Sequence, residues 1–171
     1  MSCGCHRHYK SPTRTDSMGR RLRFSNEELS ELQLWFVSNA LDGKMSDRIF
    51  IESMGLSNHG FSTYLFQRMF DVMDVNNDHL ITLPDYLNFM DKQLHGTEEE
   101  KYSLSFKIFD VNKSGTVSKD EFSQMIKNIC AMYASLLNSP MTIDEWVIDT
   151  TFKKLDPTER GLFDEREYQI N

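Results

Sequence analysis

Residues able to bind a hard cation recur at alternate positions between Asp110 and Glu121. Oxygen atoms are available at positions 1, 3, 5, 7, 9 and 12 of this window, from Asp110, Asn112, Ser114, Thr116 (through its backbone carbonyl), Ser118 and Glu121. Calcium prefers six to eight oxygen ligands, and a final glutamate supplies two of them. Gly115, at position 6, can take the positive φ that the sharp turn requires. The window therefore predicts a calcium-binding loop, hereafter loop three.

Apolar residues recur at helical spacing on both sides of loop three. Phe106 and Phe109 precede it on one helical face, and Phe122 and Met125 follow it on another. Val117, at position 8 of the loop, suits a short strand that pairs with a neighbouring loop. The whole segment therefore predicts a helix–loop–helix unit of the EF-hand type.

A second window, hereafter loop two, starts at Asp74, 36 residues before Asp110. His79 stands at its position 6, where a left-handed conformation is expected and is less favourable than for glycine. Asp85, at position 12, is one methylene shorter than glutamate, and fewer ligands favour octahedral magnesium. We expect loop two to be a weaker, magnesium-tolerant site and loop three to be the main calcium site. The ligands of loop two would be Asp74, Asn76, Asp78, Leu80 (through its carbonyl), Thr82 and Asp85.

Two further windows keep the frame of the repeat and lose some of its ligands. Ser38–Ile49, another 36 residues back, has Asp42-Gly43 at positions 5 and 6 and no acid at positions 1 and 12. We interpret it as a first hand without metal, with an unrelated helical hairpin as the alternative. The fourth window runs from Asp156 to Glu167 and carries Arg160 at position 5, where its charge opposes a bound cation. Whether this fourth loop binds calcium stays open.

The spacing of the windows predicts the architecture. The first and second hands pair within an N-terminal lobe (24–95), and the third and fourth pair within a C-terminal lobe (96–171), with a hinge at residues 91–100. The longer step to the fourth hand predicts an extended helix and a linker that ends at Pro140. Thr142 and Glu145 have the spacing of a capping box for the next helix. The predicted fold class is all-α, with four EF-hand units in two paired lobes and short β pairing between loops.

Composition limits the function further. The chain has 171 residues and a net charge of −7, yet residues 1–25 carry six Arg or Lys and one acid. The body is therefore acidic, which suits a cation binder and argues against nucleic acid as the main partner. Three cysteines do not form a disulfide framework, so we expect an intracellular, cytoplasmic setting. No catalytic motif is present, and we expect no enzyme activity.

The predicted flexible basic tail, residues 1–23, combines Cys3, Cys5, His6 and His8 with basic residues. Three readings stay open: a tail without a visible function, zinc binding, and palmitoylation of the two cysteines for peripheral membrane contact. The chain begins Met1-Ser2, so N-myristoylation is not encoded. It continues four residues past Glu167, and we expect a truncated final helix that a partner or a longer protein completes.

The frame resembles the four-hand sensors of the neuronal calcium sensor and calcineurin B-like group. The resemblance covers roughly residues 24–168 and includes Phe24-Ser25-Asn26-Glu27-Glu28-Leu29, Gly96-Thr97-Glu98-Glu99-Glu100-Lys101 and Phe106-Lys107-Ile108-Phe109-Asp110. The chain is also similar to calaxin, a ciliary sensor, and to the EF-hand region of calcium-activated NADPH oxidases. The resemblance implies a degenerate first hand and regulation of a protein target, in the cytoplasm, at a membrane or in a cilium.

The predicted function is that of a calcium sensor binding one or two ions. Such a protein opens an apolar groove to a protein partner, which we expect to be an amphipathic helix. Methionines suit such surfaces, and the candidates are Met69, Met73, Met90, Met125 and Met132, although a core position is the simpler reading for each. The alternatives are a calcium-regulated module of a larger enzyme, such as an NADPH oxidase, and a calcium buffer.

Overall fold

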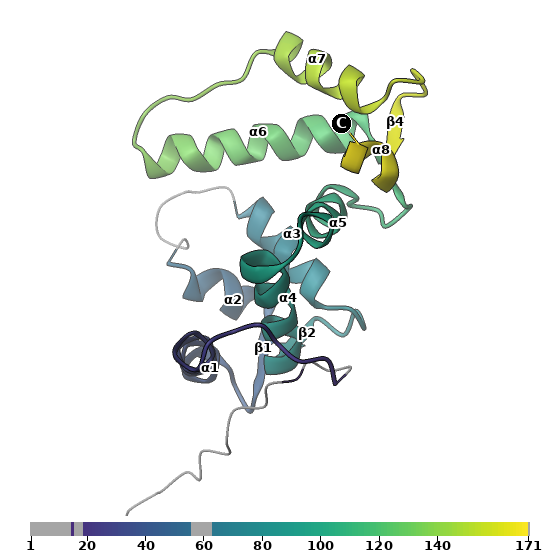
Figure 1. The fold of residues 1–171 in the computed structure, drawn as a ribbon. Helices are drawn as coiled ribbons and strands as arrows, with labels where there is room; N and C mark the ends of the chain where they lie inside the picture. Colours follow the sequence, from purple (N-terminus) through teal and green to yellow (C-terminus); the bar gives the residue numbers. More distant parts are fainter. Residues whose placement is uncertain (1–14, 16–18, 56–62, 171) are drawn as a thin grey trace, which may run out of the picture.

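The computed structural model describes residue 15 and residues 19–55 and 63–170. Over these residues the chain forms eight helices and four strands of three residues each (Figure 1). In chain order they are α1 (Asn26–Asn39), β1 (Lys44–Ser46), α2 (Asp47–Ser53), α3 (Tyr64–Met73), β2 (Leu80–Thr82), α4 (Leu83–His95), α5 (Glu98–Phe109), β3 (Thr116–Ser118), α6 (Lys119–Leu136), α7 (Glu145–Leu155), β4 (Leu162–Asp164) and α8 (Glu165–Ile170).

Each strand lies between two helices, and the strands pair two by two. β1 runs antiparallel to β2 with Met45 opposite Ile81, and β3 runs antiparallel to β4 with Val117 opposite Phe163. All four of these side chains are completely buried. The predicted all-α class, with four EF-hand units in two paired lobes, is confirmed.

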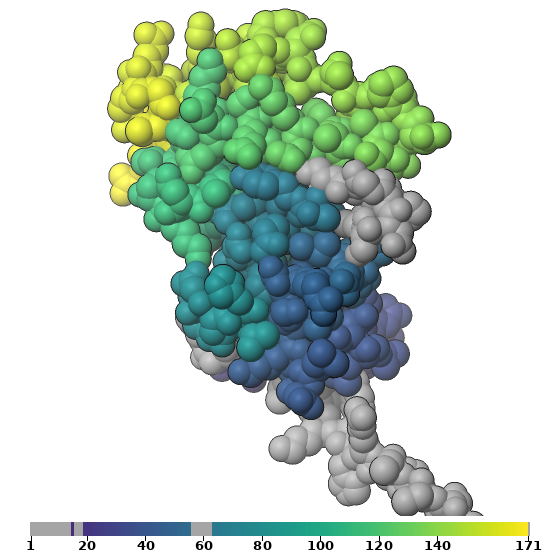
Figure 2. All heavy atoms as spheres, turned by 180° about the vertical axis from the view of Figure 1, so that it is seen from behind, coloured from purple at the N-terminus to yellow at the C-terminus, as the bar shows by residue number. Residues whose placement is uncertain are grey.

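Each lobe has its own apolar core. Phe36, Phe50 and Phe70 belong to the core of the N-terminal lobe, and Phe122, Phe152 and Phe163 belong to that of the C-terminal lobe. Helix α5 takes part in both, since Leu104 packs in the first core and Phe106 in the second. The two lobes therefore meet along α5, and in the space-filling view the green C-terminal half lies directly on the blue and teal N-terminal half (Figure 2).

The predicted hinge at residues 91–100 is a tight corner between two helices. Gly96 caps α4 so closely that a Cβ atom there would lie 2.1 Å from the carbonyl oxygen of Lys92, so a larger residue would have to displace the last turn of α4. Arg23 bridges the corner, since its guanidinium lies 2.7 Å from Asp91 of α4 and 2.5 Å from Glu100 of α5. The φ of Gly96 is −62°, which any residue can adopt, so glycine is needed here for the close approach to Lys92 and not for its backbone conformation.

The described end of the predicted basic tail packs on the N-terminal lobe. Leu22 is buried in the first core, next in sequence to the bridging residue Arg23. Cys3, Cys5 and the neighbouring histidines lie outside the described residues, and so do the readings that depend on them. None of the described helices is long and apolar enough to cross a membrane.

The connection to the fourth hand matches the sequence in its helix and differs at its cap. Helix α6 extends to Leu136, as the longer spacing predicts. The capping box predicted for Thr142 and Glu145 is wrong, because α7 begins one residue after Asp144, which holds the N-cap position. The carboxylate of Asp144 accepts a hydrogen bond from the indole N–H of Trp146 (3.3 Å) and makes no side-chain cap bond.

Candidate metal centres

Loop three is closed around the carboxylate of Asp110, which also caps the C-terminus of α5. The backbone N–H groups of Ser114 and Gly115 donate to its two oxygens at 2.9 and 2.8 Å. Positive φ values at Lys113 (56°) and Gly115 (80°) turn the backbone back on itself. As a result, the chain between α5 and β3 curls round the carboxylate of Asp110, a residue that is 7% exposed.

The remaining oxygens of loop three converge on the same side. The hydroxyl of Ser114 donates to the carbonyl of Thr116 at 3.0 Å, and the side-chain oxygen of Asn112 accepts from the Ser114 N–H at 2.9 Å. Glu121 closes the far end, since one carboxylate oxygen accepts from the N–H and hydroxyl of Ser118 at 2.9 and 2.7 Å. The six residues predicted as ligands therefore line one small loop, and their oxygens are those that calcium prefers.

Loop two repeats the arrangement with weaker closure. The N–H groups of Asp78 and His79 donate to Asp74 at 3.2 and 2.9 Å. His79 has φ 60°, the left-handed conformation expected at position 6. One oxygen of Asp85 accepts from the N–H and hydroxyl of Thr82 at 2.9 and 2.5 Å, so the shorter carboxylate is committed to the start of α4. Among the described residues, no group of three Asp, Glu, His or Cys side chains lies close enough together to hold a metal ion. The three acids of loop two, Asp74, Asp78 and Asp85, therefore do not form such a group in this structure.

The fourth loop has the same backbone and a different centre. Positive φ values recur at Glu159 and Gly161, and the N–H groups of Arg160 and Gly161 donate to Asp156 at 3.1 and 2.7 Å. The guanidinium of Arg160 forms an ion pair with Glu167, and its Nε donates to Thr158 at 2.8 Å. A side-chain cation of this loop therefore joins position 3 to position 12, as a metal ion does in an EF-hand.

The protonation of Asp156 follows from the same contacts. Burial alone would raise the pKa of this carboxyl group, but the hydrogen bonds from the Arg160 and Gly161 N–H groups outweigh it and lower the pKa below its ordinary value. The carboxylate form is therefore the one that the loop stabilises.

The first loop is shorter than the sequence frame implies. Ser38 and Asn39 belong to α1, and Ala40 holds the capping position that Asp74 and Asp110 hold in the other loops. Asp42 and Gly43, with φ 49° and 77°, form a tight turn. Leu41 and Lys44 exchange backbone hydrogen bonds of 2.8 and 3.0 Å across this turn. The window Ser38–Ile49 therefore matches the repeat from β1 onward, and its first residues do not.

A surface groove of about 560 Å³ lies beside α1 and α4, hereafter the α1–α4 groove. Trp35 stacks on Tyr86 with the ring centroids 5.1 Å apart. Burial raises the pKa of Tyr86 to about 12, so its phenol stays neutral. The groove is mainly aromatic and aliphatic with two carboxylates, and its lining residues are Glu28, Glu31, Leu32, Trp35, Met54, Tyr86, Met90 and Leu94.

The five candidate methionines lie in different environments. Met73, Met125 and Met132 are buried core residues, as the simpler reading expects. Met69 is half-buried against the first core. Met90 lines the α1–α4 groove, together with Met54, which the sequence did not single out.

Comparisons with known proteins agree with this geometry. A family model described as an EF-hand domain pair matches residues 99–170, which hold the third and fourth hands. The fold and this match identify an EF-hand protein. It is related to the recoverin family of neuronal calcium sensors and to calaxin, which confirms the resemblance seen in the sequence.

Three relatives show the extent of that similarity. A recoverin family protein of Dictyostelium discoideum is 38% identical over 45% of this chain and 34% of its own length. Guanylyl cyclase-activating protein 1 of Lithobates pipiens is 31% identical over 76% of this chain and 65% of its own. Human calaxin is 29% identical over 62% of this chain and 50% of its own. The chain thus spans less than two thirds of each relative, and none of the three names describes an enzyme.

Proposed function

We propose that this protein is a calcium sensor, without enzyme activity, that presents the α1–α4 groove to a protein partner when calcium binds. The observation that carries the proposal is the arrangement of loop three, where oxygens at all six ligand positions line one closed turn. Loop three holds the main ion, and dissociation constants of such sensor sites are on the order of 10⁻⁷–10⁻⁵ M.

Loop two is the second, weaker site in this proposal. Asp74, Asn76, Asp78 and Thr82 supply side-chain oxygens and Leu80 a carbonyl, but Asp85 is one methylene shorter than Glu121 of loop three. An octahedral magnesium ion, which keeps several waters, needs fewer protein ligands than calcium. We therefore expect magnesium to compete at loop two and calcium to dominate at loop three.

The position-12 acids connect ion binding to helix movement. Glu121 lies in the first turn of α6, and Asp85 lies in the first turn of α4. An ion that takes both oxygens of such an acid draws the start of the helix toward the loop. Because α4 also carries Tyr86 and Met90, its movement changes the width of the α1–α4 groove.

The groove has the chemistry of a site for one face of a helix. Trp35, Tyr86 and Met90 offer adaptable apolar surface, while Glu28 and Glu31 provide negative charge. An amphipathic helix with basic residues beside its apolar face is complementary to this combination. The name of guanylyl cyclase-activating protein 1 indicates a protein target for that relative, which supports a protein target here as well.

Tryptophan fluorescence tests the proposal directly. The chain has two tryptophans, and Trp146→Phe leaves Trp35 in the groove as the single reporter. We expect calcium to shift the emission of Trp35 and to raise binding of the apolar dye ANS, with the midpoint that calorimetry gives for loop three. Asp110→Ala should remove both responses. Calcium binding without either response would identify a buffer and contradict the sensor proposal.

A further inference from the structure

Arg68 is a buried charged residue on the apolar helix α3, and its exposed fraction is 4%. A guanidinium loses much hydration when it is buried, and the structure tolerates this only where several acceptors replace water. Arg68 belongs to the N-terminal lobe by sequence, but most of its acceptors belong to the C-terminal lobe. It is therefore a specific link between the two halves of the molecule.

The acceptors of Arg68 are the last carbonyls of α5 and the first residue of loop three. Its Nε donates to the carbonyl of Ile108 at 3.2 Å, and its Nη2 donates to those of Lys107 and Asp110 at 3.1 and 3.0 Å. Carbonyls at a helix C-terminus have no partner within the helix and carry partial negative charge. Arg68 thus holds the backbone of Asp110, while Ser114 and Gly115 hold its carboxylate.

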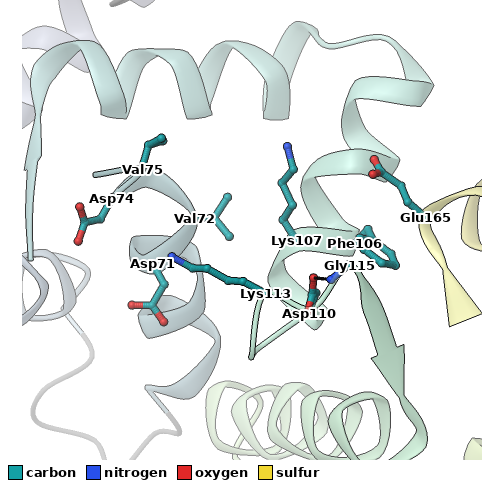
Figure 3. A pocket seen from close by; sticks show the side chains of 10 residues that line it. All are labelled: Asp71, Val72, Asp74, Val75, Phe106, Lys107, Asp110, Lys113, Gly115 and Glu165. Atoms are coloured by element: carbon teal, nitrogen blue, oxygen red, sulfur yellow. Dashed lines mark hydrogen bonds between the residues drawn. The ribbon is translucent and has the colours of Figure 1, made fainter. Parts of the chain in front are cut away.

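The same helix leads to loop two. Nη1 of Arg68 donates to Asp71 at 2.7 Å, and three residues further on Asp74, position 1 of loop two, is the C-cap of α3. The two loops also touch directly, since the ammonium group of Lys113 donates to the side-chain oxygen of Asn77. Figure 3 shows Lys113 reaching from loop three toward α3, in a pocket of about 420 Å³ that Asp74 and Asp110 also line.

From α3, aromatic packing reaches the α1–α4 groove. Phe70 of α3 packs on Phe50 with ring centroids 6.1 Å apart, and Phe50 packs edge-on against Trp35 at 6.4 Å. Phe50 and Phe70 are each 1% exposed. Closely packed interiors transmit small displacements because they leave no space to absorb them.

We propose that Arg68 is the positioning residue that couples calcium binding at loop three to loop two and to the α1–α4 groove. An ion that pulls on the carboxylate of Asp110 moves a residue whose carbonyl is anchored to α3. The inference rests on the proposed binding of calcium at loop three. It adds the route by which an ion in the C-terminal lobe acts on a groove in the N-terminal lobe.

The test uses the full chain with Trp146→Phe and Asp74→Ala, so that loop three is the calcium site under study and Trp35 is the reporter. Arg68→Met and Arg68→Lys are added to this background. The matched control is Arg48→Met, which removes an exposed arginine of the same lobe whose ion pair, within the described residues, is with Glu52 at 3.7 Å. Calorimetry measures binding at loop three, and Trp35 emission measures the response of the groove.

We expect Arg68→Met to weaken calcium binding at loop three by about fivefold or more and to remove most of the Trp35 response, while some heat of binding remains. Arg68→Lys keeps the charge but lacks the planar, forked set of N–H donors of arginine. Its calcium affinity and Trp35 response should lie between those of the parent chain and those of Arg68→Met. Arg48→Met should match the parent chain. The proposal is overturned if Arg68→Met leaves affinity and response unchanged, or if both Arg68 variants fail to fold, which would indicate a purely structural role.

The two proposals can fail separately. If Trp35 does not respond even with Arg68 present, the sensor proposal is contradicted. Calorimetry then still decides the role of Arg68, since weaker binding in Arg68→Met and Arg68→Lys, relative to Arg48→Met, supports positioning of Asp110 and equal binding overturns it.

Discussion

Loop three and the fourth loop share a backbone conformation and differ in the side chain that lies inside the loop. In both, an aspartate at position 1 accepts two backbone N–H groups and a glutamate at position 12 accepts the N–H of position 9. Loop three has Ser114 at position 5, whereas the fourth loop has Arg160, whose guanidinium pairs with Glu167. A closed loop of this type can therefore be completed by an ion or by a cation that the chain itself provides.

From this difference we expect the two loops to have separate tasks. β3 of loop three needs β4 as its partner, and Val117 lies directly opposite Phe163 across that pair. Because Arg160 joins positions 3 and 12 of the fourth loop, we expect β4 to hold its place at any calcium concentration. We infer that the fourth loop is a constant support and that loop three is the part which responds to calcium.

The largest expected effect comes from exchanging the position-12 acid for its amide. Glu121→Gln removes the charge and the bidentate ligand of loop three, so we expect calcium affinity there to fall by about 100-fold or more. This loss is larger than that expected for changing a residue that only hydrogen-bonds to a metal ligand. Glu167→Gln is the matched control in the fourth loop and should leave that affinity within about twofold. Calorimetry of both variants checks this. Equal losses would contradict the division of tasks.

The next effect is the gain of a site in the fourth loop. Arg160→Asp replaces the internal cation by a ligand at position 5, next to Asp156 and Glu167. We expect one additional calcium ion per chain, with a dissociation constant on the order of 10⁻⁴–10⁻³ M because Pro157 and Thr158 remain. Arg166→Asp makes the same change of charge on the exposed side of α8 and should add no site. Unchanged stoichiometry in Arg160→Asp would contradict the idea that Arg160 occupies the place of an ion.

A smaller effect is expected at loop two. Asp85→Glu lengthens the position-12 acid by one methylene, which allows one oxygen to stay with Thr82 while the group reaches the loop centre. We expect calcium binding at loop two to tighten on the order of tenfold and magnesium to compete less. Asp120→Glu, an exposed acid in the first turn of α6, serves as the control. Competition titrations with both metals measure the change, and identical magnesium competition would count against the hypothesis.

The sequence was most informative where one residue type serves one geometric need. Apolar residues at position 8 predicted the β pairing, since this follows from local spacing alone, while the ligand positions of loops two and three stay predictions. The left-handed conformation of His79 was predicted in the same way. The first loop was predicted less well, because a frame counted in residues cannot reveal that α1 runs two residues further and that Asp42 and Gly43 make a tighter turn.

Contacts between distant parts of the chain were beyond the sequence. Arg160 was recognised as a charge that opposes calcium, but its pairing with Glu167 depends on how the loop closes. Arg68 was missed, although a cation among Phe66, Met69 and Phe70 is a weak signal of a buried partner. The cap of α7 was misplaced because Thr142 and Asp144 both suit an N-cap by residue type, and the sequence does not distinguish between them.

The smallest effect expected is a dependence of the fourth loop on acid. The pKa of Asp156 is lowered in the folded protein, because N–H donors outweigh the cost of burial. A carboxyl group with a lowered pKa contributes stability that is complete above its unfolded value, near 3.8, and is lost as the pH falls through the lower folded value. The N–H groups of Arg160 and Gly161 donate to different oxygens of Asp156, and Asp156→Asn replaces one of these oxygens by an NH2 group, which donates and does not accept. Without calcium we expect it to lower Tm by about 2–4 °C at pH 7, and the difference from the parent chain should shrink below about pH 4.

Thermal unfolding in a chelator at pH 7, 5 and 3 measures this difference. A difference that stays the same at pH 3 would mean that the charge of Asp156 does not hold the fourth loop closed.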